Sequence, residues 1–253
     1  MFAQERLDEI MNELNKDGKI IVKELSEKFQ VTEDCIRKDL KNLEKKGLIK
    51  RTYGGAMLIR NAAHENPIVS RKKLDLDAKK KIAQKVFELI EDMDNIFLDI
   101  STTNILLAQL IAESNKKVTI ITNMFDIVNV FSKNSNVTVI CTGGVFNNEL
   151  NGFVGSSAIE RIKKFKVDKA FIGSCGVNLF DKSITTFQME DGNTKTAIIN
   201  AGKKVYLVME SKKFYIDGTY KFAEVYDVDG IIVDEVPDEN VVSSLKELDI
   251  ELI

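Results

Sequence analysis

From residue 99 onward, short segments of the chain combine glycine, hydroxyl and charged residues in a way that is typical of binding sites for anions and hydroxyl groups. Asp99 is followed by Ser101-Thr102-Thr103 at the start of a helical stretch, where backbone N–H groups can receive an anion. Similar segments follow later apolar runs: Thr122-Asn123, Thr142-Gly143-Gly144 and Gly173-Ser174-Cys175-Gly176. Glu190, Lys195 and the run from Glu210 to Lys213 add carboxylates and ammonium groups. This combination predicts a site for a phosphorylated sugar or polyol.

The elements that would position these residues are short apolar runs that alternate with helical stretches. The runs expected as strands are 96–99, 118–122, 137–141, 170–173, 205–209 and 230–234. The stretches expected as helices are 104–113, 125–132, 156–165 and 190–201. This alternation predicts an α/β domain with a parallel sheet covered on both faces and right-handed crossovers. Because ligands of such sheets bind beyond the carboxyl ends of the strands, the polar segments should meet at one edge.

Each residue of this set also has an ordinary structural explanation. A Gly-Gly pair after a strand is usually a turn, a Ser or Thr before a helix is usually an N-cap, and Lys212 or Lys213 is usually solvated. The convergence on one sheet edge therefore carries the prediction. The residues expected on the effector side are Asp99, Ser101, Thr102, Thr103, Asn123, Gly143, Gly144, Glu190, Lys195 and Lys213. The chain contains no GxGxxG or GxxxxGK[ST] string, so a dinucleotide or P-loop site is not predicted.

The first sixty residues carry a second pattern, that of a winged helix-turn-helix. Apolar residues recur at helical spacing at Leu7, Ile10, Met11 and Leu14, and again at Ile21, Leu25 and Phe29. Thr32 should then cap a third helix, whose apolar face is formed by Ile36, Leu40 and Leu43. Gly47 is placed to end that helix, and residues 48–58 alternate around Gly54-Gly55 like a two-stranded wing.

The charge of this region is polarised. Residues 35–60 hold eight Lys or Arg against two acidic residues, a balance of +6, whereas residues 1–34 hold five against nine, a balance of −4. A net charge of −3 for the whole chain hides this asymmetry. The charge run alone fits a solvated helix face equally well, but the turn, the cap and the wing favour DNA binding through the major groove. The expected DNA-binding residues are Thr32, Arg37, Lys38, Lys41, Lys50, Arg51 and Tyr53.

Length and composition set the remaining expectations. A chain of 253 residues suggests about two domains, which we place at 1–60 and 75–253 with a loosely docked linker at 61–74. No apolar run approaches the roughly 18 residues of a membrane span, and the charged N-terminus does not resemble a secretory signal, so we expect a cytoplasmic protein without a membrane partner. Three dispersed cysteines and the lone His64 predict buried free thiols, with no disulfide, no metal site and no cofactor.

The combined motifs resemble those of the DeoR-type (DeoR/GlpR) bacterial transcriptional regulators. VTEDCIRKDL followed by LIKRTYGGA is similar to the DNA-binding signature of that family, and FLDISTT, TNM, TGG near residue 143, DKAFIG and ESKKF near residue 213 are similar to its sensor motifs, in order. The resemblance implies a winged-helix DNA reader joined to an effector domain similar to ribose-5-phosphate isomerase. It also implies a repressor of sugar or polyol catabolism that responds to a phosphorylated intermediate and forms a dimer or tetramer on operator DNA.

The resemblance also implies functional roles for individual residues of this chain. Arg37, Lys38, Arg51 and Tyr53 match the family's DNA-contacting positions. The residues that match its ligand-side positions are Asp99, Ser101, Thr102, Thr103, Asn123, Gly143, Gly144, Lys195 and Lys213. The chain departs from the family in four places: Cys35 replaces Thr, Lys38 replaces Arg, Ser101 replaces Gly and Glu210 replaces Asp. Lys in place of Arg loses bidentate geometry, so the base preference at that position should differ.

Two alternatives remain at the level of sequence. The second domain could be an isomerase in which Asp99, Glu190 and Lys195 supply acid–base groups for an enediol mechanism. We expect no enzyme activity, because metabolism does not require a fused DNA reader and a shared fold does not carry chemistry. The second domain could also serve assembly alone, with an effector pocket that has lost its ligand.

Overall fold

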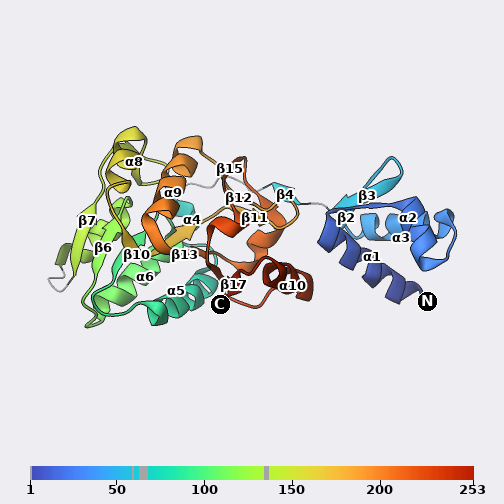
Figure 1. Ribbon diagram of the computed structural model, residues 1–253, viewed down its shortest axis with the longest axis horizontal. Coiled ribbons are helices and arrows are strands. Elements are labelled where there is room, and N and C mark those ends of the chain that lie inside the picture. Colours follow the sequence, from blue (N-terminus) through green and yellow to red (C-terminus); the bar gives the residue numbers. More distant parts are fainter. Residues whose placement is uncertain (1, 59, 63–67, 134–136) are drawn as a thin grey trace. The chain divides into compact units, whose positions relative to one another are not determined.

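The computed structural model describes residues 2–58, 60–62, 68–133 and 137–253 (Figure 1). The chain divides into two compact units. The first contains residues 1–61 with 238–244, and the second contains residues 62–237 with 245–253. His64, the lone histidine from which no metal site is predicted, lies outside the described residues.

The first unit is a winged helix-turn-helix. Its elements are α1 (Ala3–Asp17), β1 (Lys19–Ile21), α2 (Val22–Phe29), α3 (Glu33–Lys45), β2 (Ile49–Thr52) and β3 (Gly55–Leu58). The hydroxyl of Thr32 accepts a hydrogen bond from the Cys35 N–H at 3.3 Å and caps α3, as the sequence predicts. Gly47 has a φ of +74°, a conformation that suits glycine and follows the end of the helix. The predicted two-stranded wing is confirmed as the antiparallel pair β2–β3.

The wing contains a third strand that the sequence analysis did not predict. Ile21 was assigned to a helix, but it belongs to β1 and is 46% exposed, and α2 begins with the buried Val22. β1 pairs antiparallel with β3, which places Ile21 opposite Gly55. A Cβ atom at Gly55 would lie 2.0 Å from the Ile20 carbonyl oxygen, so the absence of a side chain there lets β1 approach.

The second unit is built on a seven-stranded sheet in which every pairing is parallel. Its strands are β5 (Asn95–Leu98), β6 (Thr119–Thr122), β7 (Thr138–Cys141), β10 (Val167–Gly173), β13 (Gly202–Val208), β16 (Gly230–Ile232) and β17 (Glu251–Leu252). The spatial order is β17-β16-β13-β10-β5-β6-β7. All six predicted strands are confirmed, and β17 is an additional short edge strand.

Helices cover both faces of this sheet, as predicted. They are α4 (Ile68–Arg71), α5 (Leu76–Leu89), α6 (Thr102–Glu113), α7 (Phe125–Val130), α8 (Ser156–Ile162) and α9 (Met189–Ala201). A further helix, α10 (Glu239–Glu247), consists mostly of residues that are grouped with the first unit. The helices α5, α6 and α7 pack in series, whereas α8 packs on α9. Figure 1 shows these two groups on opposite sides of β10 and β13. The core between them includes Phe97, Phe171 and Ile82, none of which is exposed.

Short antiparallel strands form two smaller sheets beside the seven-stranded one. They are β8 (Val145–Asn147) with β9 (Gly152–Val154), and β11 (Gly176–Asn178) with β12 (Ser183–Thr186) and β15 (Tyr220–Glu224). Further short elements are β4 (Asn61–Ala62), β14 (Ile216–Asp217) and the 3₁₀ turns η1 (Phe131–Lys133), η2 (Ser211–Tyr215) and η3 (Val225–Asp227). None of these short elements is expected from the pattern of the sequence.

The part of residues 61–74 that the structure describes is docked, which corrects the expectation of a loose linker. Residues 68–71 form α4, and Ile68 is 1% exposed within the core of the second unit. The Ile68 N–H donates to the Glu149 carbonyl at 3.2 Å. Burial of a large aliphatic side chain stabilises this segment by about 2 kcal/mol, which the weak periodicity of the surrounding sequence does not reveal.

The order of the strands defines a switch point in the sheet. The chain proceeds from β5 outward through β6 and β7, and then returns to β10, which lies on the other side of β5. From β10 it proceeds in the opposite direction through β13 and β16. The crevice between the carboxyl ends of β5 and β10 is therefore the position where sheets of this kind bind ligands.

Candidate functional site

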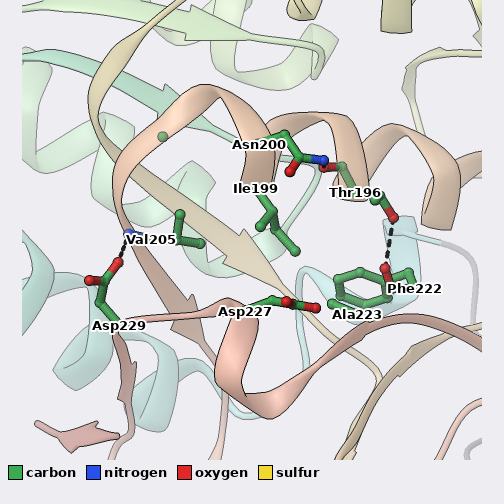
Figure 2. Close-up of a pocket in the computed structure, with 9 residues that line it drawn as sticks. Thr196, Ile199, Asn200, Val205, Phe222, Ala223, Asp227 and Asp229 are labelled. Carbon is green, nitrogen blue, oxygen red and sulfur yellow. Dashed lines mark hydrogen bonds between the residues drawn. The ribbon is translucent and has the colours of Figure 1, made fainter.

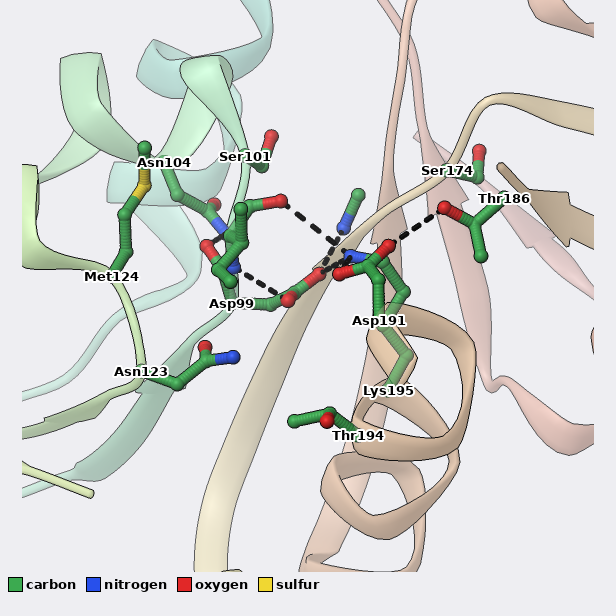
Figure 3. Close-up of polar contacts among 12 residues, drawn as sticks. Asp99, Ser101, Asn104, Asn123, Met124, Ser174, Thr186, Asp191, Thr194 and Lys195 are labelled. Atoms are coloured by element: carbon green, nitrogen blue, oxygen red, sulfur yellow. Dashed lines mark hydrogen bonds and ion pairs between the residues drawn. The ribbon is translucent and has the colours of Figure 1, made fainter. Parts of the chain in front are cut away.

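A cluster of buried polar residues lies at this switch point (Figure 3). Asp99 directly follows β5 and is not exposed, while Ser174 directly follows β10 and is 6% exposed. Lys195, on α9, reaches the same place and is 3% exposed. The structure therefore brings together predicted residues that are separated by almost one hundred positions in the sequence.

The centre of the cluster is a lysine between two carboxylates. Lys195 Nζ donates a hydrogen bond to Asp99 Oδ2 and lies 3.6 Å from Asp191 Oδ1. The Gly173 N–H donates to Asp99 Oδ2 at 3.0 Å, and the Thr186 hydroxyl donates to Asp191 Oδ2 at 2.7 Å. Two carboxylates against one ammonium group leave this group with a formal charge of −1 when all three are ionised.

Burial and mutual attraction act in opposite directions on these groups. Burial raises the pKa of Asp99 to about 6, although the charge of Lys195 opposes that rise. Burial tends to lower the pKa of Lys195, but Asp191 and Asp99 outweigh this effect and the pKa is raised. Lys195 therefore stays protonated at neutral pH, and its charge is already compensated by protein carboxylates.

Two buried amide oxygens face the same region and lack hydrogen-bond partners among the described residues. They are Asn104 Oδ1 and Asn123 Oδ1, and neither residue is exposed. Asn104 uses its amide nitrogen to donate to the carbonyl oxygens of Asp99 and Phe171, at 3.1 and 2.9 Å. Asn123 likewise donates to the Phe153 carbonyl at 3.1 Å. Unpaired buried acceptors are costly, so this pair suits a ligand that supplies hydroxyl donors.

The N-terminus of helix α6 lies at the cluster. Ser101 caps it by accepting a hydrogen bond from the Thr103 N–H at 3.3 Å, and Thr102 and Thr103 are both buried. A Cβ atom on Gly173 would lie 2.8 Å from the Ser101 Cβ, so the glycine lets the two loops approach. The positive end of α6 is thus directed to the crevice, where it favours an anion.

Gly143 and Gly144 follow β7 and shape the next loop. Their φ values are +61° and +128°, which side chains rarely tolerate. A Cβ atom on Gly144 would also lie 2.9 Å from the Ala158 Cβ, whereas one on Gly143 would meet nothing closer than 3.9 Å. The path of this loop therefore depends on the absence of a side chain at Gly144, and at Gly143 it is favoured by the conformational freedom of glycine.

A second group of charges lies at the carboxyl ends of β13 and β10. Lys213 Nζ donates to the Ser174 carbonyl oxygen at 2.9 Å and lies 2.8 Å from Glu210 Oε2. Glu210 is 5% exposed, and its other oxygen lies 3.9 Å from the ammonium group of the buried Lys79. Burial alone would raise the pKa of Glu210, but Lys213 and Lys79 lower it to about 2. Glu210 therefore stays ionised between two lysines.

This second group also contacts the segment that follows the DNA-binding unit in the chain. Lys79 Nζ donates to the carbonyl oxygens of Arg71 and Leu74, at 2.7 and 2.6 Å, and so holds the end of α4. Arg71 Nε is buried and has no hydrogen-bond partner among the described residues. Burial raises the pKa of the Cys175 thiol, while the positive charges of Lys213 and Arg71 oppose this rise.

One of the residues predicted for the site lies apart from the polar cluster, and the cluster contains residues that were not predicted. Glu190 is exposed and does not join the cluster, whereas Asp191, one position later, is 3% exposed and faces Lys195. On a helix the residue that lies beside Lys195 is four positions away, and this spacing could have identified Asp191. The sequence analysis also missed Asn104, Thr186, Lys79 and Arg71.

A separate cavity of about 400 Å³ lies near the amino ends of the strands (Figure 2). Its lining includes Gly202, the first residue of β13, and the acidic residues Asp227 and Asp229. Asp229 accepts hydrogen bonds from Lys204 Nζ and the Val205 N–H, at 2.7 and 2.8 Å. No predicted effector residue lines this cavity, and its carboxylates would repel a phosphate.

On the first unit, the predicted DNA-binding residues lie on the exposed side of α3 and on the wing. The residues Thr32, Arg37, Lys38, Lys41, Lys50, Arg51 and Tyr53 are all exposed. Arg37 pairs with Glu33 and Asp34 at 2.5 and 2.8 Å, and Arg51 pairs with Glu44 at 2.7 Å. Tyr53 lies fully exposed at the tip of the wing. Lys38, Lys41 and Lys50 have no ion pair within the described part of the chain.

A buried ion pair fixes α3 within its unit. Arg6 Nε on α1 donates to Asp39 Oδ2 at 2.5 Å, and Arg6 Nη2 donates to Asp39 Oδ1 at 3.3 Å. The two residues are 8% and 6% exposed. This two-bond contact orients α3 from its buried face, opposite to the cationic side.

The described residues contain neither a helix that could span a membrane nor a cluster of metal-binding side chains. None of the helices in that part of the chain combines the length and the apolar character needed to cross a membrane. No group of three or more His, Cys, Asp or Glu is placed there to hold a metal ion. Cys35, Cys141 and Cys175 are free thiols, but they are partly buried rather than buried.

Comparison with known proteins matches both units. The family model for the DeoR-like helix-turn-helix domain matches residues 6–62, and the model for the DeoR C terminal sensor domain matches residues 75–235. The chain is 31% identical over 255 residues to the HTH-type transcriptional repressor GlcR of Bacillus subtilis, with 100% of this chain and 96% of the relative covered. It is 30% identical over 253 residues to the glycerol-3-phosphate regulon repressor of Escherichia coli, with 100% and 99% covered.

Two further similarities are weaker or shorter. The chain is 31% identical over 216 residues to the lactose phosphotransferase system repressor of Lactococcus lactis, with 85% of this chain and 84% of the relative covered. Among solved structures, ribose 5-phosphate isomerase A from Neisseria gonorrhoeae is similar at 14% identity and a TM-score of 0.39, with 54% and 53% of the two chains covered. A fold similarity of this size gives no information about activity.

Proposed function

Because the chain belongs to the DeoR family of transcriptional regulators, we propose that it is a repressor of a sugar or polyol catabolic operon, released from its operator by a phosphorylated sugar or polyol. Its relatives include repressors named for glycerol 3-phosphate and lactose phosphotransferase regulons. The observation that carries the proposal is the buried polar cluster at the switch point, where a chain that also bears a DNA-binding unit offers a site for a small polar ligand.

The chemistry of the cluster supports a ligand with both hydroxyl groups and a phosphate. The unpaired oxygens of Asn104 and Asn123 accept hydrogen bonds from hydroxyls, as do the carboxylates of Asp99 and Asp191. Lys195 is a poor receptor for phosphate, because two carboxylates already compensate its charge. We therefore assign the sugar or polyol hydroxyls to this part of the cluster.

The phosphate requires uncompensated positive charge. The N-terminus of α6 at Ser101–Thr103 provides a positive helix end, and Lys213, bonded to the Ser174 carbonyl oxygen, provides an ammonium group near the end of β10. Arg71, at the end of α4, adds a guanidinium group whose Nε is buried and unpaired among the described residues. The carboxylate of Glu210 pairs with both Lys213 and Lys79, so two ammonium groups share its charge. We assign the phosphoryl group to the space bounded by these donors, together with the glycine loop at Gly143-Gly144.

The same contacts offer a route from ligand to DNA-binding unit. A phosphate that binds Lys213 competes with the Glu210 carboxylate for its ammonium group. Glu210 also interacts with the ammonium group of Lys79, and Lys79 donates to two carbonyl oxygens at the end of α4. The chain leads from the DNA-binding unit to α4, so a shift of α4 alters how two such units are presented to DNA. A coupling of about 1 to 3 kcal/mol, or roughly 5- to 150-fold in operator affinity, is enough for release.

We also propose a role for each part of the chain, in line with its membership of this family. Residues 1–60 bind DNA, residues 61–74 connect the units, and residues 75–253 bind the effector and mediate assembly into a homo-oligomer whose paired winged helices read a repeated or palindromic operator. The protein acts in the cytoplasm and needs neither a metal nor a cofactor. No enzyme activity is proposed.

Titration of a protein–operator complex tests the proposal. The operator is first selected from randomised duplex DNA, and its affinity is then measured by fluorescence anisotropy in the presence of phosphorylated sugars and polyols of three to six carbons. We expect one of these compounds to weaken operator binding by 5-fold or more, with the unphosphorylated compounds as controls. Stabilisation of the protein by a compound that never changes operator affinity would contradict coupling, and failure to enrich any DNA would contradict the DNA-binding role.

A further inference from the structure

The exposed face of α3 that carries lysines also carries one acidic residue, Asp34, whose negative charge is unexpected on a surface that binds DNA. Lys38, Lys41 and Lys45 follow Asp34 at intervals of four, seven and eleven residues, so these four positions share one face of the helix. That face is opposite to the buried residues Ile36, Leu40 and Leu43. The Asp34 side chain is 82% exposed, so it does not serve the core of the unit.

Asp34 is also tied to the arginine that is expected to read bases. Arg37 Nη1 donates to Asp34 Oδ1 at 2.8 Å, and Arg37 Nη2 donates to Glu33 Oε2 at 2.5 Å. A guanidinium group has five N–H donors, so at least three remain for another partner. The two carboxylates therefore contact Arg37 at the N-terminal turn of α3, which is the part of a recognition helix that contacts base edges.

A carboxylate in a major groove is repelled by phosphates unless a base offers it a donor. Cytosine presents its N4 amino group there and is the base that aspartate and glutamate recognise, whereas guanine presents the O6 and N7 acceptors that arginine recognises. A thymine or guanine in front of Asp34 would place an acceptor oxygen against the carboxylate. The charge of Asp34 thus penalises these bases and favours cytosine.

We propose that Asp34 is a specificity-determining residue that accepts a hydrogen bond from cytosine N4 in each half-site, while Arg37, positioned by Glu33, reads an adjacent guanine. The inference rests on the proposed DNA-binding function and adds the bases that the operator must contain. Glu33 has a separate role. Its side chain lies beside the helix face that carries Asp34 and the lysines, and it contacts Arg37.

Selection from a randomised duplex library, performed with the full chain and with D34N, E33Q and the control E27Q, tests the inference. Glu27 is an exposed residue of α2, so E27Q removes the same charge from the same unit. Each selected sequence is then measured by anisotropy with single base-pair substitutions at one fixed salt concentration. Thermal unfolding of each variant verifies that it is folded.

We expect the wild-type sequences to contain an invariant cytosine beside an invariant guanine in each half-site. D34N should reduce the preference for that cytosine by about 5-fold or more and shift it toward adenine, which asparagine recognises. E33Q should relax the preference for the guanine, and E27Q should raise affinity for all sequences by the same factor. Identical base preferences in the wild type and D34N would overturn the inference while leaving DNA binding intact. Failure of the wild type to select any sequence would overturn the proposed function, and the inference with it.

Discussion

Lys213 donates a hydrogen bond to the carbonyl oxygen of Ser174 at 2.9 Å, and so joins the segment after β13 to the segment after β10 beside the switch point. If its ammonium group receives the effector phosphate, K213M removes a charge-assisted hydrogen bond and keeps the apolar stem. We expect effector affinity to fall by about 10- to 150-fold, measured by calorimetry with the compound identified in the operator titration. The control is K212M, because Lys212 is more exposed and pairs with Asp75 instead. Equal losses in the two variants would contradict the assignment.

Glu210 gives a prediction for stability at low pH. Its pKa is lowered to about 2 in the folded protein, so its ionised form stabilises the protein above the ordinary glutamate pKa near 4.5, and this contribution is lost as the pH falls. We expect the free energy of unfolding to fall between pH 5 and pH 3 by about 2 kcal/mol more in the wild type than in E210Q. Urea unfolding of both proteins at the two pH values measures this difference. A gap that is independent of pH would show that Glu210 is not stabilised as an anion.

Much of the fold could be predicted because the pattern of the sequence and the local chemistry agree. Thr32 caps α3 and Gly47 ends it, as their positions indicate, and the apolar runs of the second unit form the predicted parallel strands. The elements that were missed are short. β1 and β17 have three and two residues, too few to show a period, and β1 exists because Gly55 leaves room for it.

The position of the polar cluster at one edge of the sheet was predictable from the sequence, but the choice of its charged residues was less so. Asp99 was predicted because it follows an apolar run, and Lys195 because it lies near the start of an expected helix; the structure places the two side chains in contact. Glu190 was chosen over Asp191 because the start of α9 could not be fixed to one residue, and a shift of one position rotates a side chain by about 100°. Lys79 was missed since its partners are the carbonyl oxygens of Arg71 and Leu74, which no side-chain pattern reveals.

Substitution of each of the two glycines after β7 by alanine should lower the stability of the protein by a different amount. G144A places a Cβ atom 2.9 Å from the Ala158 Cβ at a φ of +128°, so strain and overpacking add, and we expect a loss of about 2 to 4 kcal/mol. G143A meets no close atom and has a φ of +61°, so its cost should be about 1 kcal/mol. Chemical unfolding of both variants provides the comparison. A cost at Gly144 no larger than that at Gly143 would mean that the loop moves to admit the side chain.

The ion pair between Arg6 and Asp39 predicts how the DNA-binding unit responds to loss of one partner. R6M leaves the Asp39 carboxylate buried without its two hydrogen bonds, and removal of one partner from such a pair typically costs about 3 to 5 kcal/mol. The double variant R6M/D39L removes both charges and should recover most of that loss, because apolar residues of similar size can replace a buried pair. Unfolding of the wild type, both single variants and the double variant forms a complete thermodynamic cycle. Additive effects of the two substitutions would show that the pair contributes no coupling, and α3 would then depend on its apolar face alone for its orientation.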